Sequence, residues 1–597
     1  MSTTESLDTI RWNLADLLPD GERAAQPPEL VDALLDEALA RSRAFAERHR
    51  GALATIDGAG LAEAMSELAA IYDLAGRAGS YAQLDFSTDT ADPRRGALLA
   101  RVEERSTALG TTLIFFELEW AALSDERVAE LLAHDDLGFC RHHLESARRY
   151  RPHLLSEPEE RILNEKAISS RSAWSRLFDE LTSAIEVELD ERVPLDVALA
   201  RLASPSRERR QETAQAVTRA LEPGLRTRAY VFNTLLADKA TDDRLRAYPH
   251  WIAARNLDNE ASDESVAALV SAVQGRYELA RRWYRLKARL LGIERLADYD
   301  RMAPLSTDEE HVEWPRAREL VLDSYHAFST TLGDLAERFF DERWIDAPPG
   351  RGKHAGAFCS YTVPSVHPYV LLNYAGRRRD VLVLAHELGH GVHAALAARQ
   401  GIFQQGTPLT LAETASVFGE ALTFARLLEA SPTPAARLSL LAEDIEGAIA
   451  TVFRQVAMNR FEDAVHTARR EDGELSVERF AQLWAQTQTD LLGDAVEVTD
   501  DYRSWWSYIP HFISTPGYVY AYAYGQLLAL SVYERYLVEG RQFEQRYIDL
   551  LAAGGSRSPE ELGAIVGIDL ADPGFWDRGL DLVEQRLVAA EAAAAEL

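Results

Sequence analysis

The segment HELGH, residues 386–390, holds the side chains best suited to chemistry in this sequence. On a helix, residues four apart share a face, so His386 and His390 can bind one metal ion together. Glu387 is rotated away from this pair, toward the open position of such an ion, where a carboxylate can act as general base on water. The apolar runs VLVLA before the motif and AALA after it predict a buried helix. Buried histidines and a buried glutamate are costly without a partner, so the segment predicts a bound cation.

A catalytic tetrahedral metal site needs a third protein ligand and leaves a fourth position open. His393 shares the helix face, but seven helical residues rise about 10.5 Å, which is too far for His386 and His393 to bind one ion. Leu396 occupies the position at which the elongated motif HExxHxxGxxH has its last histidine. The third ligand is therefore expected from another segment, and His393 is expected to pack beside the site.

The segment TPLTLAETASVFGEALTFARLLE, residues 407–429, predicts a second apolar helix that can double back against the first. Glu413 and Glu420 are seven residues apart and therefore lie on one face of it. Glu413 could be the third metal ligand, or it could cap the helix, because Thr410 to Glu413 fits a capping box. Glu420 stands in mid-helix among apolar neighbours, which favours a carboxylate that orients a ligand histidine.

A tyrosine-rich segment, TPGYVYAYAYGQ, follows His511 near the end of the chain, and its tyrosines alternate strictly: Tyr518, Tyr520, Tyr522 and Tyr524. Alternation alone indicates a strand, but the flanking Pro516 and Gly517 and the leucine-rich run that follows favour a helix. In a helix the first and third tyrosines share one face, and the second and fourth share another. One pair can then face a ligand while the other packs.

The remaining elements are predicted to be mostly helical. Segments such as ELVDALLDEALARSRAFAERHR place apolar residues at three- and four-residue steps. Helical patterning pauses near residues 190–210, so we predict an N-terminal helical domain, 1–200, and a second domain, 201–597. Residues 354–380 favour β-structure and indicate two short strands directly before the metal-binding helix. The sequence predicts a mostly α protein with one small sheet inserted before residue 381.

Composition excludes several classes of partner. The chain has 597 residues, with 95 acidic and 64 basic side chains and a net charge of −31, which repels nucleic acid and anionic lipid. Two cysteines, Cys140 and Cys359, are too few for a disulfide framework or a thiolate zinc site. The first 20 residues lack the pattern of a secretory signal, and no apolar run approaches the length of a membrane span. We expect a cytoplasmic protein without nucleic-acid or membrane partners.

The motifs HELGHGVHA and LAETASVFGEAL together resemble the thimet-oligopeptidase-like zinc metallopeptidases, and within them the oligoendopeptidase F branch. The stretches WNLADL (12–17), HPYVLLNY (367–374) and IPHFISTPGYVYAYAYG (509–525) are similar to that branch as well. The resemblance keeps the motif order and spans nearly the whole chain, although the N-terminal third contributes only general helical character.

The resemblance implies a gluzincin site with one zinc ion, bound by His386, His390 and Glu413, and Glu387 as general base and acid. It also implies a mostly helical, two-lobed ellipsoid with a deep channel that admits short unfolded peptides and excludes folded proteins. Residues 201–597 would be the catalytic domain. The small sheet would offer an edge strand to the substrate backbone.

In the resembled family, a histidine and tyrosines from a late, glycine-containing loop contact the substrate, and the matching positions here are His511, Tyr518 and Tyr522. A phenol is a suitable donor to the oxyanion of amide hydrolysis because it stays protonated near neutral pH. The register is open at this stage, since Tyr520 or Tyr524 could take either role.

The resulting hypothesis is a zinc-dependent endopeptidase that hydrolyses short unfolded peptides. Two alternatives remain: a carboxydipeptidase on the same scaffold, which needs a cation to grip the substrate's C-terminus, and a zinc-containing protein that binds peptides without cleaving them. An intact Glu387 argues against the second. Cleavage-site preference and oligomeric state are not predicted.

Overall fold

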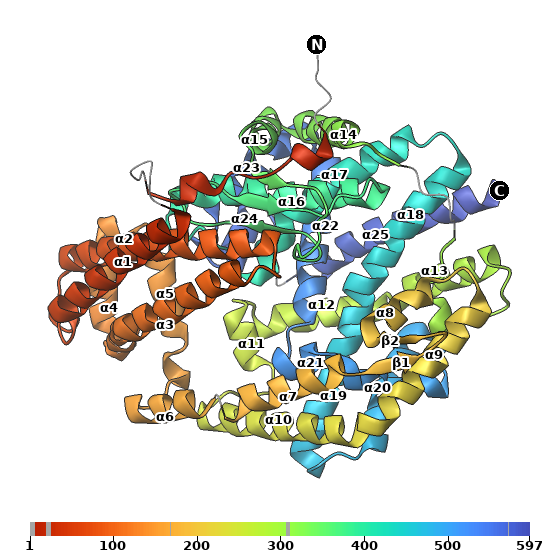
Figure 1. Ribbon diagram of the computed structural model, residues 1–597, viewed down its shortest axis with the longest axis horizontal. Helices are drawn as coiled ribbons and strands as arrows, with labels where there is room; N and C mark the ends of the chain where they lie inside the picture. The colour runs from red at the N-terminus through yellow and green to blue at the C-terminus, as the bar shows by residue number, and fades with distance from the viewer. Residues whose placement is uncertain (1–5, 20–25, 168, 306–310, 571) are drawn as a thin grey trace. The chain divides into compact units, whose positions relative to one another are not determined.

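The computed structural model describes residues 6–19, 26–167, 169–305, 311–570 and 572–597 (Figure 1). The chain forms two compact units, each described by itself and each assembled from three segments. The first comprises Met1–Arg151, Glu309–Leu427 and Arg535–Asp569, and the second Pro152–Asp308, Leu428–Glu534 and Leu570–Leu597. The predicted division at residue 200 is a different one and stays a prediction, as does the predicted channel.

The first unit is built mainly from helices. They are α1 (Pro27–His49), α2 (Gly58–Thr88), α3 (Pro93–Ala122), α4 (Asp125–Leu132), α5 (Arg141–Arg149), α14 (Trp314–Phe328), α15 (Thr330–Asp341), α16 (Arg378–Ala397), most of α17 (Leu409–Ala430), α23 (Glu544–Ala553) and α24 (Pro559–Ile565). The three long helices α1 to α3 pack side by side (Figure 1) around a buried apolar cluster that includes Leu35, Ala78 and Val102.

The two short strands predicted before α16 are present, and a third strand that was not predicted completes the sheet. Strands β5 (Phe358–Ser360) and β6 (Tyr369–Leu371) pair antiparallel, with Cys359 opposite Val370. Strand β4 (Ile345–Asp346) pairs parallel to β6 on its other side, so β5 is an edge strand. The fully buried β6 accounts for its continuous apolar sequence.

The second unit is also mainly helical. Its helices are α6 (Glu157–Ala167), α7 (Arg171–Ser183), α8 (Leu195–Ala200), α9 (Arg207–Leu221), α10 (Leu225–Leu245), α11 (Ala253–Asp258), α12 (Asp263–Gly275), α13 (Tyr277–Leu290), α18 (Pro434–Ala448), α19 (Arg454–Asp472), α20 (Val477–Leu492), α21 (His511–Ser514), most of α22 (Tyr520–Glu539) and α25 (Pro573–Ala595). Phe232, Phe461, Phe480, Trp506 and Phe512 are among the rings of its core.

The mostly α fold is confirmed, but the prediction of only one sheet is wrong. The second unit contains an antiparallel pair, β1 (Glu186–Glu188) with β2 (Arg192–Pro194), and a parallel pair, β3 (Leu296–Ala297) with β7 (Val496–Glu497). These strands have two or three residues each. Such strands are too short to show alternation, and the second pair joins segments far apart in sequence.

The expectation that no apolar run approaches a membrane span is wrong for one segment. The helical segment Arg378–Gln400 is long and apolar enough to cross a membrane by composition, with a mean hydropathy of 1.3. However, 67% of its most apolar stretch is buried inside the protein. Burial of that extent is typical of a core helix of a globular protein, which explains the apolar sequence without a membrane.

Candidate active site

Helix α16 carries both histidines of the HELGH motif, is capped at its N-terminus and is buried along its apolar stretch. At its N-terminus, the Asp380 carboxylate accepts hydrogen bonds from the backbone N–H groups of Ala375 and Arg377, at 2.9 and 3.0 Å. Leu384 and Leu388 are completely buried. The helix is therefore a fixed support for the polar side chains of the HELGH motif.

Two glycines let α16 and α17 approach closely. A Cβ atom at Gly389 would lie 2.4 Å from the backbone oxygen of Ala415 on α17. A Cβ atom at Gly419 would lie 3.0 Å from the backbone oxygen of Ala385 on α16, and it would also meet the hydroxyl of Tyr325, which donates to that oxygen at 2.7 Å. Any side chain at either glycine would push the two helices apart. The close backbone contact brings acids of α17 to the histidines of α16.

The side chains of His386, His390 and Glu413 converge on one point. Glu413 Oε2 lies 3.3 Å from His386 Nε2 and 3.5 Å from His390 Nε2. One ligand atom from each residue lies within 4.8 Å of the others, so all three can bind one ion. Two imidazole nitrogens and one carboxylate oxygen are the donor set of many catalytic zinc sites.

Helix α17 begins at Leu409, so Thr410 lies inside the helix and does not take the N-cap position that a capping box would require. The Glu413 carboxylate also accepts a hydrogen bond from Ser416 Oγ at 2.6 Å. Both observations favour Glu413 as a ligand over Glu413 as a cap. Ser416 was not identified from the sequence; its position three residues after the glutamate, on the same helix face, is the signal that was available.

Glu420 lies beside the other nitrogen of His386. Its Oε2 is 3.2 Å from His386 Nδ1, while Nε2 of the same ring faces Glu413. A carboxylate at this place holds the ring with Nε2 pointing to the convergence point. Burial lowers the pKa of His386, but the hydrogen bonds to Glu413 and Glu420 outweigh it and raise that pKa well above its usual value.

Glu387 is buried, with 7% of its surface exposed, directly beside the histidines in sequence. Burial raises the pKa of its carboxyl group to about 7, aided by the negative charges of Glu413 and Glu420 and opposed by His386. A carboxyl group whose pKa lies near neutral pH can both accept and return a proton. The burial that the apolar sequence predicts is thus the main cause of the raised pKa of Glu387.

His393 packs beside the site, as predicted. It is 3% exposed, and its Nδ1 has no hydrogen-bond partner among the described residues. Burial lowers the pKa of His393 to about 3, so the ring is neutral. The Tyr361 ring, which follows strand β5, lies 6.2 Å from the His393 ring and 6.5 Å from the His390 ring, between ring centroids. Only the tertiary structure brings Tyr361 to this place.

His511, Tyr518 and Tyr522 form a second polar group, in the second unit. His511 Nε2 lies 3.2 Å from the Tyr522 hydroxyl oxygen. The rings of Tyr518 and Tyr522 meet edge to face, with centroids 5.1 Å apart. All three side chains are partly exposed. Burial, with a smaller contribution from the charge of Arg454, lowers the pKa of His511, which favours the neutral ring.

The other two tyrosines of the run are core residues. Tyr520 and Tyr524 are both 0% exposed. The Tyr520 hydroxyl oxygen accepts from Asn259 Nδ2 at 3.0 Å, and the Tyr524 hydroxyl donates to Ser265 Oγ at 3.4 Å. The two pairs therefore separate as predicted. The helical expectation needs one correction, because α22 begins at Tyr520 and Tyr518 lies in the preceding turn.

The two groups belong to different compact units. His386, Glu387, His390, Glu413 and Glu420 belong to the first unit, and His511, Tyr518 and Tyr522 belong to the second.

The similarity of this chain to known proteins extends over almost its whole length. Residues 201–582 match the model of "Peptidase family M3", and residues 119–186 match "Oligopeptidase F". Oligopeptidase PepF of Bacillus subtilis is 26% identical over 588 residues, which cover 96% of this chain and 86% of that protein. Group B oligopeptidase PepB of Streptococcus agalactiae is also 26% identical and covers 86% of each chain. The crystal structure of oligoendopeptidase-F from Enterococcus faecium superposes with a TM-score of 0.72, at 24% identity, over 95% of this chain and 100% of that one.

Proposed function

This chain belongs to peptidase family M3, in its oligoendopeptidase F branch, and on that premise we propose that it is a zinc-dependent endopeptidase of short, unfolded peptides. The names of its relatives support a peptidase that acts on oligopeptides. The proposal adds the metal, the residue roles and the internal position of the cut. It also retains the expected cytoplasmic location.

We propose His386, His390 and Glu413 as the ligands of a single zinc ion. Their donor atoms converge within 4.8 Å, and two neutral-nitrogen donors with one carboxylate suit zinc better than magnesium or calcium. When bound there, zinc would supply Lewis acidity to water and to the peptide carbonyl group. Glu420, at 3.2 Å from His386 Nδ1, keeps the ring oriented for this ligation.

Glu387 is the proposed general base and acid. Its carboxylate accepts a proton from the attacking water and later gives a proton to the nitrogen of the leaving amine. Burial favours this role, because it raises the pKa of Glu387 toward neutral pH.

His511, Tyr518 and Tyr522 are the proposed donors to the substrate. In amide hydrolysis the carbonyl oxygen gains negative charge as water adds, and a phenol hydroxyl can donate a hydrogen bond to it. Tyr518 and Tyr522 are the two partly exposed tyrosines of the run, which supports them over Tyr520 and Tyr524. The 3.2 Å contact between His511 and the Tyr522 hydroxyl oxygen supports a shared role.

The edge strand β5 is the proposed binding strand for the substrate backbone. Among the described residues it pairs only with β6, in the order β4-β6-β5, so no described strand lies on its other side. An extended peptide can add to such an edge through main-chain hydrogen bonds, which are independent of side-chain sequence. This mode of binding suits an enzyme that accepts varied unfolded peptides.

The observation that carries the proposal is the convergence of the two histidines and Glu413 next to the buried Glu387. The test is mass spectrometry of products from unstructured peptides of graded length, with and without a zinc chelator. We expect internal cuts that disappear when the chelator is added and return when zinc is added back. Folded proteins should be cleaved little. Stepwise loss of C-terminal dipeptides would favour the carboxydipeptidase instead. Zinc-loaded protein that cleaves none of the peptides would contradict the proposal.

A further inference from the structure

The turn before Tyr518 is held by a buried carboxyl group of the second unit. Gly517 has a φ of +75°, and its backbone N–H donates to Glu462 Oε1 at 2.7 Å. Glu462 lies on α19 and is 0% exposed. Its other oxygen, Oε2, has no hydrogen-bond partner among the described residues. Burying a carboxyl group with a single hydrogen bond costs free energy on folding, so the hydrogen bond to Gly517 is an unusual feature of this core.

The opposite side of Gly517 is packed against the start of α11. A Cβ atom at this glycine would lie 3.1 Å from Ile252 Cγ1 and 3.4 Å from Arg255 Cβ. The Arg255 guanidinium also lies over the Tyr518 ring, 5.9 Å from its centroid. The glycine thus fits between α11 and Glu462, and its positive φ directs the chain into the tyrosine group.

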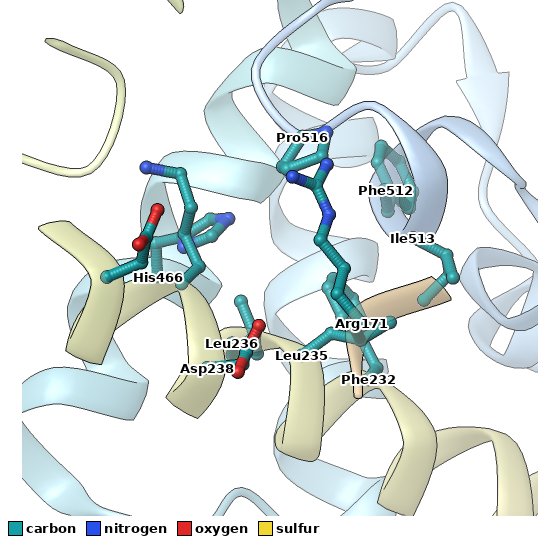
Figure 2. Close-up of a pocket in the computed structure, with 11 residues that line it drawn as sticks. Arg171, Phe232, Leu235, Leu236, Asp238, His466, Phe512, Ile513 and Pro516 are labelled. Atoms are coloured by element: carbon teal, nitrogen blue, oxygen red, sulfur yellow. The ribbon is translucent and has the colours of Figure 1, made fainter. Parts of the chain in front are cut away.

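Beyond the glycine, the turn borders a small pocket (Figure 2). Pro516, Phe512 and Ile513 line it from the turn and α21, and Arg171 and His466 are among the residues that line it from other helices. Its volume of about 30 Å³ holds roughly two water molecules, which is too little for an amino acid. The pocket is therefore a poor ligand site, and Pro516 borders it.

We propose that Glu462 is a positioning residue for the reaction. By accepting the hydrogen bond from Gly517, it holds the turn in the conformation in which Tyr518 can reach the substrate. The ring contact between Tyr518 and Tyr522 extends this effect to Tyr522. This hydrogen bond and the contacts with α11 hold Gly517, in addition to the turn's own backbone bond from Tyr518 N–H to the Thr515 carbonyl oxygen. The inference rests on the proposed role of the two tyrosines as donors to the substrate.

Two variants separate the hydrogen bond from general packing. Glu462→Gln keeps an acceptor oxygen and the side-chain volume, whereas Glu462→Leu keeps much of the volume but removes the acceptor. We expect Glu462→Leu to lower kcat about ten- to a hundredfold, with a smaller change in KM, because a misplaced catalytic group mainly affects the transition state. Glu462→Gln should keep kcat within about threefold of the wild-type value. Val465→Ala, a fully buried change on the same helix, should lower Tm without this loss of kcat.

Hydrogen exchange of residues 511–524 gives a readout that is independent of activity. Exchange should be faster in Glu462→Leu and unchanged in Glu462→Gln. Unchanged exchange and unchanged kcat in Glu462→Leu would overturn the proposal. Equal losses of kcat in Glu462→Leu and Glu462→Gln would overturn it as well. If Glu462→Leu does not fold, Gly517→Ala replaces it, with the same expected gain in exchange and loss of kcat. A fully active Tyr522→Phe would contradict the proposed donor role, whereas the exchange result would still test whether Glu462 holds the turn.

Discussion

The proposed zinc ligands and the proposed substrate donors are supported in opposite ways. His386 and His390 lie on α16, a helix of 20 residues whose backbone touches that of α17 at Gly389. Tyr518 lies in a turn after α21, a helix of four residues. The turn is held by its own backbone hydrogen bonds, by one hydrogen bond to Glu462 and by contacts with α11. One support consists of two long, closely packed helices, and the other of a glycine-containing turn beside a small pocket.

The difference follows from what each group has to do. A metal ion requires its ligands within a few tenths of an ångström, so rigid elements that leave no room for movement suit it. Donors that meet a substrate can come from a segment that adjusts after binding. We therefore expect changes in the helix pair to affect metal content and stability, and changes in the turn to affect kcat with zinc retained.

The largest effect is expected for Glu387→Gln, which keeps the size of the side chain but cannot accept the proton. Turnover should fall about 10³- to 10⁴-fold, since general acid–base catalysis contributes roughly that much at its upper end. Zinc content, measured by mass spectrometry of the metal, should stay at one ion per chain. Glu429→Gln, at an exposed position of α17, is the matched control and should keep full activity. A Glu387→Gln variant with wild-type kcat would show that another group takes the proton.

The second prediction compares two tyrosines of the run. Tyr522→Phe should lower kcat about 10²-fold through loss of an oxyanion donor, with Tm nearly unchanged. Tyr520→Phe should instead lower Tm, because it leaves the buried Asn259 side chain without the hydroxyl that accepts from it. The measurements are steady-state kinetics and thermal unfolding of both variants. If both variants lost kcat equally, the separation into an exposed and a buried pair would have no functional meaning.

The third prediction tests the contact between α16 and α17. Gly389→Ala places a Cβ atom 2.4 Å from the Ala415 backbone oxygen, so the helices have to separate. Unfolding free energy should fall by about 1–3 kcal/mol, as for other overpacked cores, and zinc affinity should fall with it. Gly447→Ala is the control, since a Cβ atom there meets nothing within 4 Å and alanine favours the helix. Equal stability of both variants would show that the helices are not held by this contact.

The smallest effect concerns acid stability of the second unit. His466 is 2% exposed and stacks on Trp251 at 4.3 Å between centroids. Burial, together with the charges of Lys239 and Arg470, lowers its pKa well below the usual value of 6.5. The unfolded chain therefore binds a proton below pH 6.5 that the folded chain does not bind, and stability falls as pH falls.

This histidine should account for about 2 kcal/mol of stability loss between pH 7 and pH 5. His466→Phe should remove that part of the pH dependence, measured by urea unfolding at both pH values. If the unfolding free energy changed equally with pH in the variant and the wild type, His466 would have to be protonated in the folded protein.

Several features could be predicted because they are local in sequence. The HELGH spacing places two histidines on one helix face in any α-helix, and the flanking apolar runs indicate its burial. The alternating tyrosines become two pairs once the run is helical, and the structure confirms the partition. Strands β3 and β7 could not be predicted, because each has two residues and they pair across about 200 positions.

Glu413 shows where local reasoning ends. A ligand and a helix cap both suit an acid near the start of an apolar helix, so spacing alone left both hypotheses open. The close contact at Gly389 and Gly419 brings Glu413 Oε2 to within 3.5 Å of both imidazoles, which supports the ligand hypothesis. The support of Gly517 by Glu462 is of the same kind, since 55 residues separate the two.

The sequence by itself determined the candidate functional side chains: the helix with two histidines and a glutamate, the second acidic helix and the tyrosine run. Short-range spacing carries this information, since a helix places side chains by its own geometry. The tertiary structure alone decided which acid meets the histidines, which tyrosines stay exposed and which carboxyl group holds the turn. Those outcomes depend on contacts between segments distant in the chain, where the absence of a single Cβ atom sets how close two backbones come.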